Sequence, residues 1–206
     1  LVADGVAFNT LLLACSRYER VAEAEEVFAE MKSAGVEPTH VTASILVKMY
    51  GRAKMLDRAV EVSEQIKRES GRTPNVHVYT CLIRACVQNQ QVRRSWELFN
   101  RMLCEGVQPD AITYGTVIHG CIYNNKFEVA MELVRHAHML PQPKEAAPEH
   151  GEHSPLKLSQ LRLRRPVPLQ PEVLRALHTA LRKKSQVALV AELEGAGLVG
   201  APARLG

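Results

Sequence analysis

Apolar residues in the first two-thirds of the chain recur with the spacing of amphipathic helices. A first stripe is formed by Phe8, Leu11, Leu12 and Cys15. A second stripe is formed by Ala24, Val27, Phe28 and Met31. Both follow the i, i+3, i+4, i+7 order that places side chains on one face of a helix. The polar segment Tyr18-Glu19-Arg20 separates the two stripes, so the pattern predicts two amphipathic helices joined by a tight turn.

This pair of stripes recurs along the chain at a nearly constant interval. Pro38, Pro74 and Pro109 mark the interval, because they lie 36 and then 35 residues apart. Gly35 and Gly106 suit the left-handed position after a helix, and the prolines that follow cannot continue one. A period of this length indicates an array of helix pairs that stack on their neighbours. We therefore predict an all-α fold without strands, a right-handed α-solenoid of helix-turn-helix repeats.

The period also divides the chain into segments. Residues 1–4 are expected to be the tail of a preceding repeat, followed by repeats over residues 5–39, 40–75, 76–110 and 111–140. Residues 141–168 are rich in Pro, Ala and Glu at first and lack helical periodicity, so we expect a disordered linker there. Pro171 suits the first turn of a helix and begins a further apolar pattern, which predicts a degenerate helical pair or cap over 169–198. Residues 199–206 are expected to be a disordered tail.

Several segments resemble pentatricopeptide repeats (PPR). The stretches that carry the resemblance are residues 6–12, 25–38, 96–102 and 111–118, and the likeness extends over about residues 4–140. Tetratricopeptide repeats are the structural alternative, but they predict a 34-residue period and a Trp-Leu-Gly-Tyr signature, neither of which is present.

The resemblance implies that the array binds single-stranded RNA, with each repeat reading one base. Counting from the first residue of each repeat, the fifth and the last residues are implied to hydrogen-bond the base edge. These pairs are Asn9 with Thr39, Ser44 with Asn75, Thr80 with Asp110, and Gly115 with Glu145. The second residue of each repeat is implied to pack on the base faces. These residues are Val6, Val41, His77 and Ile112.

The fourth base-reading pair and one base-packing residue depart from the family pattern. Gly115 has no side chain and Glu145 falls in the expected linker, so the fourth pair gives no base preference. His77 replaces the usual aliphatic residue, although an imidazole can stack on a base. For the first three pairs, the resemblance implies a preference for pyrimidine, A and G in that order, from the 5′ end of the RNA.

Positive charge is concentrated at the end of the chain. Residues 1–140 hold 16 Lys and Arg and 16 Asp and Glu, whereas residues 156–206 hold nine basic and three acidic residues. In the repeats, Arg17 and Arg52 occupy the thirteenth position and are expected to contact phosphates. The tail offers a competing source of phosphate contacts, through Arg162, Arg164, Arg165, Arg182, Lys183 and Lys184.

The sequence contains no constellation typical of an enzyme, and we expect no catalytic activity, cofactor, metal or small-molecule substrate. The five cysteines form no CxxC motif, and His136-x-His138 and His150-x-x-His153 flank the expected linker. No apolar run is long enough to suggest a membrane span. The resemblance also implies an organellar location, in the chloroplast or mitochondrion, with other RNA-processing proteins as further partners.

A protein-interaction scaffold remains the alternative function, because the inner surface of a helical repeat array can also hold a partner protein. The fifth and ninth positions of the repeats are mostly polar, which favours RNA over an apolar protein segment. These positions hold Asn9, Ser44, Thr80 and Gly115, and Leu13, Lys48, Arg84 and His119.

Overall fold

The described residues form ten helices and no strand. The computed structural model describes residues 4–141, 156, 158, 163 and 165–199. The chain divides into two compact units, Leu1–Val107 and Gln108–Gly206. The predicted all-α class is confirmed.

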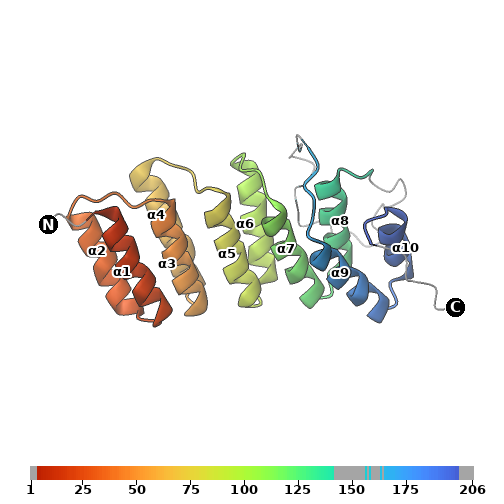
Figure 1. The fold of residues 1–206 in the computed structure, drawn as a ribbon, viewed down its shortest axis with the longest axis horizontal. Coiled ribbons are helices and arrows are strands. Elements are labelled where there is room, and N and C mark those ends of the chain that lie inside the picture. The colour runs from red at the N-terminus through yellow and green to blue at the C-terminus, as the bar shows by residue number, and fades with distance from the viewer. Residues whose placement is uncertain (1–3, 142–155, 157, 159–162, 164, 200–206) are drawn as a thin grey trace. The chain divides into compact units, whose positions relative to one another are not determined.

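The first unit contains six helices, which form three helix-turn-helix pairs. They are α1 (Gly5–Arg17), α2 (Val21–Ser33), α3 (His40–Arg52), α4 (Leu56–Ser70), α5 (Val76–Gln88) and α6 (Val92–Cys104). The first helices of the pairs, α1, α3 and α5, pack side by side, and each also packs against the second helix of its own pair (Figure 1). We call the first helix of each pair the inner helix.

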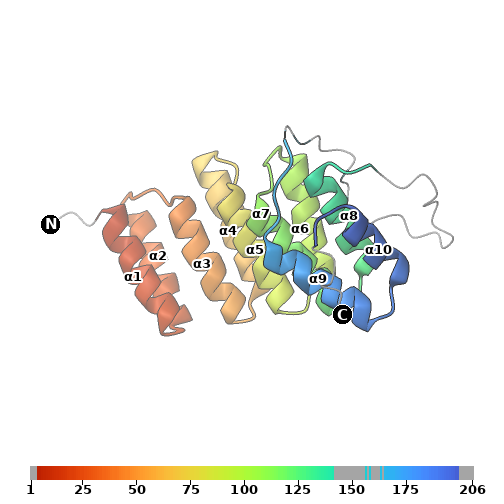
Figure 2. The same ribbon diagram turned by 45° about the vertical axis from the view of Figure 1, so that its right-hand side comes forward.

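The second unit contains the remaining four helices. They are α7 (Ala111–Tyr123), α8 (Phe127–His138), α9 (Pro171–Lys183) and α10 (Val187–Gly195). Helix α7 packs against α8, α9 packs beside α7, and α10 packs against α9 (Figure 2).

The predicted apolar stripes form the cores of the units. In α3, α5 and α7 the fourth, seventh, eighth and eleventh positions are all buried. Leu11 of α1 differs, because 53% of its surface is exposed. Among the described helices of its unit, α1 packs mainly against α2 and α3, which explains why one edge of its stripe is uncovered.

Each of the helices α1, α3, α5 and α7 begins at a side-chain cap. Asp4, Thr39, Asn75 and Asp110 precede these helices, and the side-chain oxygen of each accepts a hydrogen bond from a backbone N–H of the first turn. Such caps satisfy N–H groups that have no partner within the helix. The last residue of a repeat is therefore also the N-cap of the next helix.

Gly51 allows α3 and α5 to approach each other closely. A Cβ atom on Gly51 would lie 2.7 Å from the Cβ of Ala85, which is closer than carbon atoms pack. The amide of Asn89 also joins the two helices, because its Nδ2 donates to the carbonyl oxygens of Gly51, at 2.9 Å, and Ala85, at 2.8 Å.

The described part of the segment between α8 and α9 differs from the disordered linker expected over 141–168. Leu156, Leu158 and Leu163 are buried, and the backbone N–H of Val167 donates to the carbonyl oxygen of Ala137 at 2.7 Å. The prediction of a linker relied on the Pro, Ala and Glu residues at the start of the segment. It did not take into account the leucines that follow, whose side chains are buried. His150, His153 and Glu145 lie outside the described residues, as do residues 1–3 and 200–206.

Candidate nucleic-acid interface

Apolar side chains are exposed on the first turn of three inner helices. At the second position of the repeats, Val6 is 73% exposed, Val41 57% and Ile112 47%. His77, at the same position of α5, is also exposed. These four side chains, of which Val6, Val41 and Ile112 are β-branched, are exposed enough to pack against the flat face of a base, the role that the family resemblance implies for them.

The residues expected to read base edges are less accessible at the fifth position. Ser44 is 5% exposed and Thr80 6% exposed, and each hydroxyl donates to a carbonyl oxygen of its own helix. Asn9 is partly exposed, and Gly115 is buried. A base edge could reach the hydroxyl oxygens as acceptors only along the narrow exposed surface of these side chains.

The last residues of the repeats are more open. Thr39, Asn75 and Asp110 are exposed and act as N-caps. Asn75 Oδ1 accepts from the backbone N–H of Val78 at 3.0 Å, which leaves its Nδ2 group available to donate. Asp110 Oδ1 accepts from the Thr113 backbone N–H at 2.8 Å, and Oδ2 remains as an acceptor.

The structure links the two members of the first predicted pair through a shared partner. Thr42 Oγ1 donates to Asn9 Oδ1 at 2.8 Å, and the same hydroxyl accepts from the backbone N–H of Thr39 at 3.1 Å. For Ser44 and Asn75, by contrast, the side-chain hydrogen bonds stay within α3 and α5 respectively. Asn9 and Thr39 are thus held in a fixed relation by Thr42, a residue to which the sequence pattern assigned no role.

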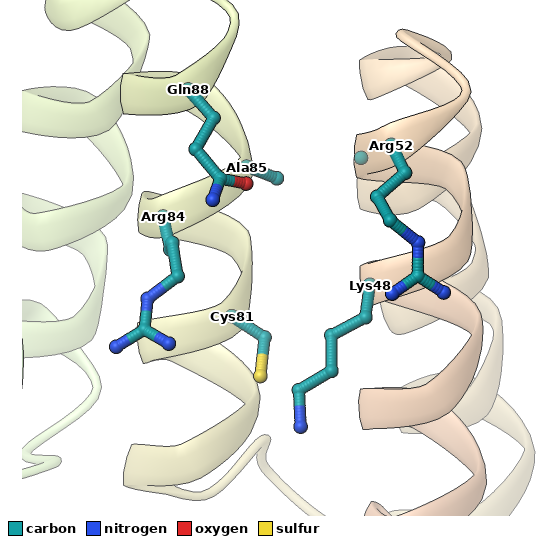
Figure 3. A pocket seen from close by; sticks show the side chains of 7 residues that line it. Lys48, Arg52, Cys81, Arg84, Ala85 and Gln88 are labelled. Carbon is teal, nitrogen blue, oxygen red and sulfur yellow. The ribbon is translucent and has the colours of Figure 1, made fainter. Parts of the chain in front are cut away.

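Between α3 and α5 lies a pocket of about 210 Å³ that is lined by three cationic side chains (Figure 3). Its lining residues are Lys48, Gly51, Arg52, Cys81, Arg84, Ala85 and Gln88. No carboxylate is among them. In Figure 3 the Lys48 side chain extends from α3 toward α5, whereas the guanidinium groups of Arg52 and Arg84 lie over their own helices, α3 and α5.

Only one of the two predicted phosphate residues lines this pocket. The guanidinium group of Arg52 also donates to the backbone carbonyl of Ser16 at 2.6 Å and to the Ser16 hydroxyl, so it joins the end of α1 to α3. Arg17 is exposed and is not among the lining residues. Lys48 and Arg84 were not predicted as phosphate contacts. Both occupy the ninth position of their repeats, and a basic residue at the same position of two neighbouring repeats was the sequence feature that could have identified them.

His77, the second residue of its repeat, lies beside the pocket. Its Nε2 is 3.4 Å from Lys48 Nζ and 3.8 Å from the Sγ of Cys81. Burial raises the pKa of the Cys81 thiol above its usual range, and the nearby charges of Lys48 and Arg84 oppose this shift. The thiol is therefore neutral near pH 7, and the charge in this part of the seam comes from the lysine and the arginines.

Charge is separated between the two helices of each repeat. The inner helices α1, α3, α5 and α7 contain no Asp or Glu. Acidic residues of the first unit lie mainly on α2 and α4, and five acidic residues of the unit pair with a basic residue of the neighbouring repeat. These pairs are Glu25–Arg58, Glu69–Lys32, Asp57–Arg94, Glu64–Arg101 and Glu105–Lys67. The repeats hold equal numbers of basic and acidic residues, but none of the acidic residues lies on an inner helix.

The described part of the chain lacks two other kinds of site. No group of three or more His, Cys, Asp or Glu residues there is arranged to hold a metal ion. None of the described helices combines the length and apolar character needed to cross a membrane.

Family models match most of the region that carries these features. A model of the PPR repeat family matches residues 3–52 and 74–123, and a model of the single PPR repeat matches residues 41–70 and 112–136.

Curated relatives match over a similar part of the chain. A pentatricopeptide repeat-containing protein of Arabidopsis thaliana is 30% identical over 116 residues, which are 55% of this chain and 20% of that protein. The mitochondrial 15S rRNA processing factor CCM1 of Komagataella phaffii is 30% identical over 120 residues, which are 57% of this chain and 16% of that protein. The chain therefore corresponds to only a small part of the length of these relatives.

Solved structures share the fold. The pentatricopeptide repeat protein PPR10 from maize superposes with a TM-score of 0.66 at 23% identity, over 94% of this chain and 26% of that one. The PPR domain of protein-only RNase P 1 of Arabidopsis thaliana, solved in complex with tRNA, superposes with a TM-score of 0.63 at 19% identity, over 94% and 89% of the two chains. At these identities the likeness shows the fold alone. Because the repeat models together match more than half of its residues, the chain belongs to the pentatricopeptide repeat family.

Proposed function

We propose that this chain binds single-stranded RNA selectively and does not itself catalyse a reaction. The observation that carries the proposal is the set of acid-free inner helices, with the cationic pocket beside the exposed His77. A protein-binding scaffold would not require this combination, because an apolar protein segment gains nothing from three cations in a seam whose lining holds no carboxylate.

Each part of the inner helices suits one part of a nucleotide. The exposed side chains of Val6, Val41 and His77 can pack on base faces, and such stacking is tolerant of sequence because every base has a π-face. Lys48, Arg52 and Arg84 can hold phosphates, which favours any RNA equally. Selectivity must then come from the polar residues at the fifth and last positions.

The proposed base order follows the family resemblance. Asn9 with Thr39 favours a pyrimidine, Ser44 with Asn75 favours A, and Thr80 with Asp110 favours G. The first pair has additional support in the hydrogen bonds by which Thr42 holds Asn9 and Thr39 in place. Gly115 offers no side chain, so the fourth base is left unspecified.

The names of the relatives suggest the setting. PPR10 was also solved in complex with an 18-nucleotide psaJ RNA element, and CCM1 is named as a processing factor of mitochondrial rRNA. Other relatives are named as chloroplastic or mitochondrial proteins. We therefore infer a role in organellar RNA processing, stability, editing or translation, in which other RNA-processing proteins act on the bound transcript.

The test is competition binding of the chain to short RNAs that differ at single bases. The Asp110→Asn variant should move the third preference from G toward A, because an amide presents a donor where the carboxylate presents only acceptors. Asparagine caps a helix as well as aspartate does, so the start of α7 should be kept. Glu37→Gln serves as the control, because it removes the same charge from an exposed position outside the inner helices.

The base ranking decides the result. A ranking that changes at the third base in Asp110→Asn, and at no base in Glu37→Gln, supports the proposed readout. If both variants rank the RNAs as the parent does, base reading by Asp110 is wrong. If the parent binds no RNA but captures a protein segment, the scaffold function replaces the RNA proposal.

A further inference from the structure

We propose that α9 and α10 form a fifth repeat, whose inner helix holds the RNA backbone without reading a base. This inference rests on the proposed RNA-binding function and extends it to a segment that the repeat models do not match. The sequence predicted a degenerate pair or cap there, with Arg182, Lys183 and Lys184 among the tail residues that could contact phosphates, but it did not predict a repeat.

The backbone of the α9–α10 pair repeats that of the other four pairs. Helix α9 has 13 residues, as do α1, α3, α5 and α7. The turn after α9 contains Ser185 in the left-handed region, at φ 55°, and the same turn position holds Glu19, Lys54, Gln90 and Asn125 with φ between 53° and 61°. Non-glycine residues rarely adopt this conformation, so five occurrences at one position indicate one structural unit.

The packing of α9 follows the same register. Its fourth, seventh and eleventh positions are Leu174, Leu177 and Leu181, which are all buried. Helix α9 lies beside α7, as α3 lies beside α1 in the first unit (Figure 2). Helix α10 is shorter than the equivalent helices, with nine residues, and is followed by Gly197 at φ 68°.

The seam between α7 and α9 is tight at the fifth position of the fourth repeat. Gly115 occupies the fifth position of α7, and a Cβ atom there would lie 3.1 Å from Cγ2 of Val173. Val173 thus takes the space next to the fifth position. At the second position of α9, the exposed Glu172 replaces the aliphatic residue that would pack on a base.

The exposed stripe of α9 is cationic instead. Arg175, Thr179, Arg182 and Lys183 occupy the fifth, ninth, twelfth and thirteenth positions and are all exposed. Arg182 pairs with Glu194 at 3.1 Å, whereas Arg175 and Lys183 have no ion-pair partner among the described residues. Lys183 has the same position in its repeat as Arg17 and Arg52.

The chemistry of this stripe matches a phosphodiester backbone. Two exposed cations about two helical turns apart, without a carboxylate partner in the described part of the chain, can each contact a phosphate. Phosphate contacts carry no sequence information. The fifth repeat therefore adds affinity for single-stranded RNA to the chain without adding base selectivity.

The test compares two double variants of the whole chain, each of which removes two positive charges. Arg175→Gln/Lys183→Gln alters the stripe. Lys54→Gln/Lys126→Gln alters exposed lysines in the turns after α3 and α7, outside the stripe. Affinity for RNAs of different sequence is measured over a range of salt concentrations, and circular dichroism verifies that both variants keep their helices.

In the stripe variant, binding to every RNA should weaken by a common factor. The slope of log affinity against log salt should fall by about 0.7 for each of the two phosphates that is no longer neutralised. In the control variant the slope should stay close to that of the parent chain. Arg175→Lys should have the same slope as the parent, because a lysine also neutralises a phosphate.

Three outcomes would overturn the inference while leaving the proposed function in place. They are an unchanged slope in the stripe variant, an equal loss in the control, and a change in base ranking instead of a uniform loss. If the parent chain binds no RNA, the proposed function itself fails.

Discussion

At the scale of single residues, small side chains decide how closely the inner helices pack. Gly51 is the clearest case, because any larger residue would meet Ala85 of the neighbouring repeat. The cationic pocket lies in this seam, so Gly51 supports the helix spacing at which residues of α3 and α5 line one pocket.

Gly51→Ala should destabilise the chain by about 1–3 kcal/mol, the usual cost of overpacking a close contact. The free energy of unfolding in urea is the measurement. Gly195→Ala is the control, since its added Cβ would meet no atom. In the Gly51→Ala/Ala85→Gly variant the clash is removed, so part of the lost free energy of unfolding should be recovered. Equal stability of Gly51→Ala and the parent would show that the helices can separate without cost.

His138 gives the second unit a dependence on pH. Burial lowers the pKa of His138 below its usual value of 6.5, and its Nε2 atom has no hydrogen-bond partner in the described part of the chain. The unfolded chain therefore binds a proton at a higher pH than the folded chain does, so stability is full above pH 6.5 and falls as the pH decreases below it.

His138→Leu should flatten this part of the stability profile. Unfolding is measured for parent and variant from about pH 7.5 to about pH 5, where an unperturbed histidine titrates. As the pH decreases, the free energy of unfolding should fall more for the parent than for the variant. A difference that is constant over this range would contradict the assignment.

At the scale of elements, one buried ion pair attaches α10 to α8. The Arg135 side chain is buried, and its Nε and Nη2 donate to the two carboxylate oxygens of Glu192 at 2.5 and 2.6 Å. These hydrogen bonds hold the pKa of Arg135 above its usual value. Without Glu192, the guanidinium charge would stay buried and uncompensated.

Glu192→Ala should destabilise the second unit by about 2 kcal/mol, below the full cost of an orphaned buried charge, because Glu192 is itself a third exposed. Urea unfolding and hydrogen exchange of the α10 amides are the measurements. Glu194→Ala, on the same helix, removes a part-buried pair with His178 and a more exposed pair with Arg182 and should cost less, because no buried guanidinium loses its partner. The Arg135→Met/Glu192→Leu variant should recover stability. Equal losses from the two single alanine variants would show that burial of Arg135 is not costly.

At the scale of the whole chain, the separation of charge matters more than its sum. Five acidic residues on α2, on α4 and at the C-cap of α6 are paired with basic residues of neighbouring repeats, and ion pairs near the surface add little stability. They do neutralise that side of the first unit. The inner helices of this unit, and α9 in the second unit, keep cations that no carboxylate of the described residues neutralises.

Lys48→Gln/Arg84→Gln should therefore weaken binding to all RNAs alike and lower the salt slope by up to about 0.7 for each phosphate that is no longer neutralised. Lys32→Gln/Lys67→Gln is the matched control, because it removes the same charge from lysines that are paired with Glu69 and Glu105. Equal effects of the two variants would mean that RNA responds to net charge and not to the pocket.

The sequence by itself determined the helices and their pairing. Period, apolar stripes and Gly-Pro stops act locally, because each repeat contacts only its neighbours, so the pattern of one unit predicts the next. Asp4, Thr39, Asn75 and Asp110 as caps, and Pro171 as the start of α9, follow from the same local rules.

Tertiary structure decided which polar residues meet. The contact of Thr42 with Asn9, the pocket formed by Lys48, Arg52 and Arg84, and the approach of Val173 to Gly115 all join different repeats. The pairing of Arg135 with Glu192 spans 57 residues of chain. A periodic pattern identifies the face of a helix on which a side chain lies, but the distance between two helices depends on the size of every residue in the seam. The pocket and the register of α9 against α7 therefore emerge only when the helices are packed.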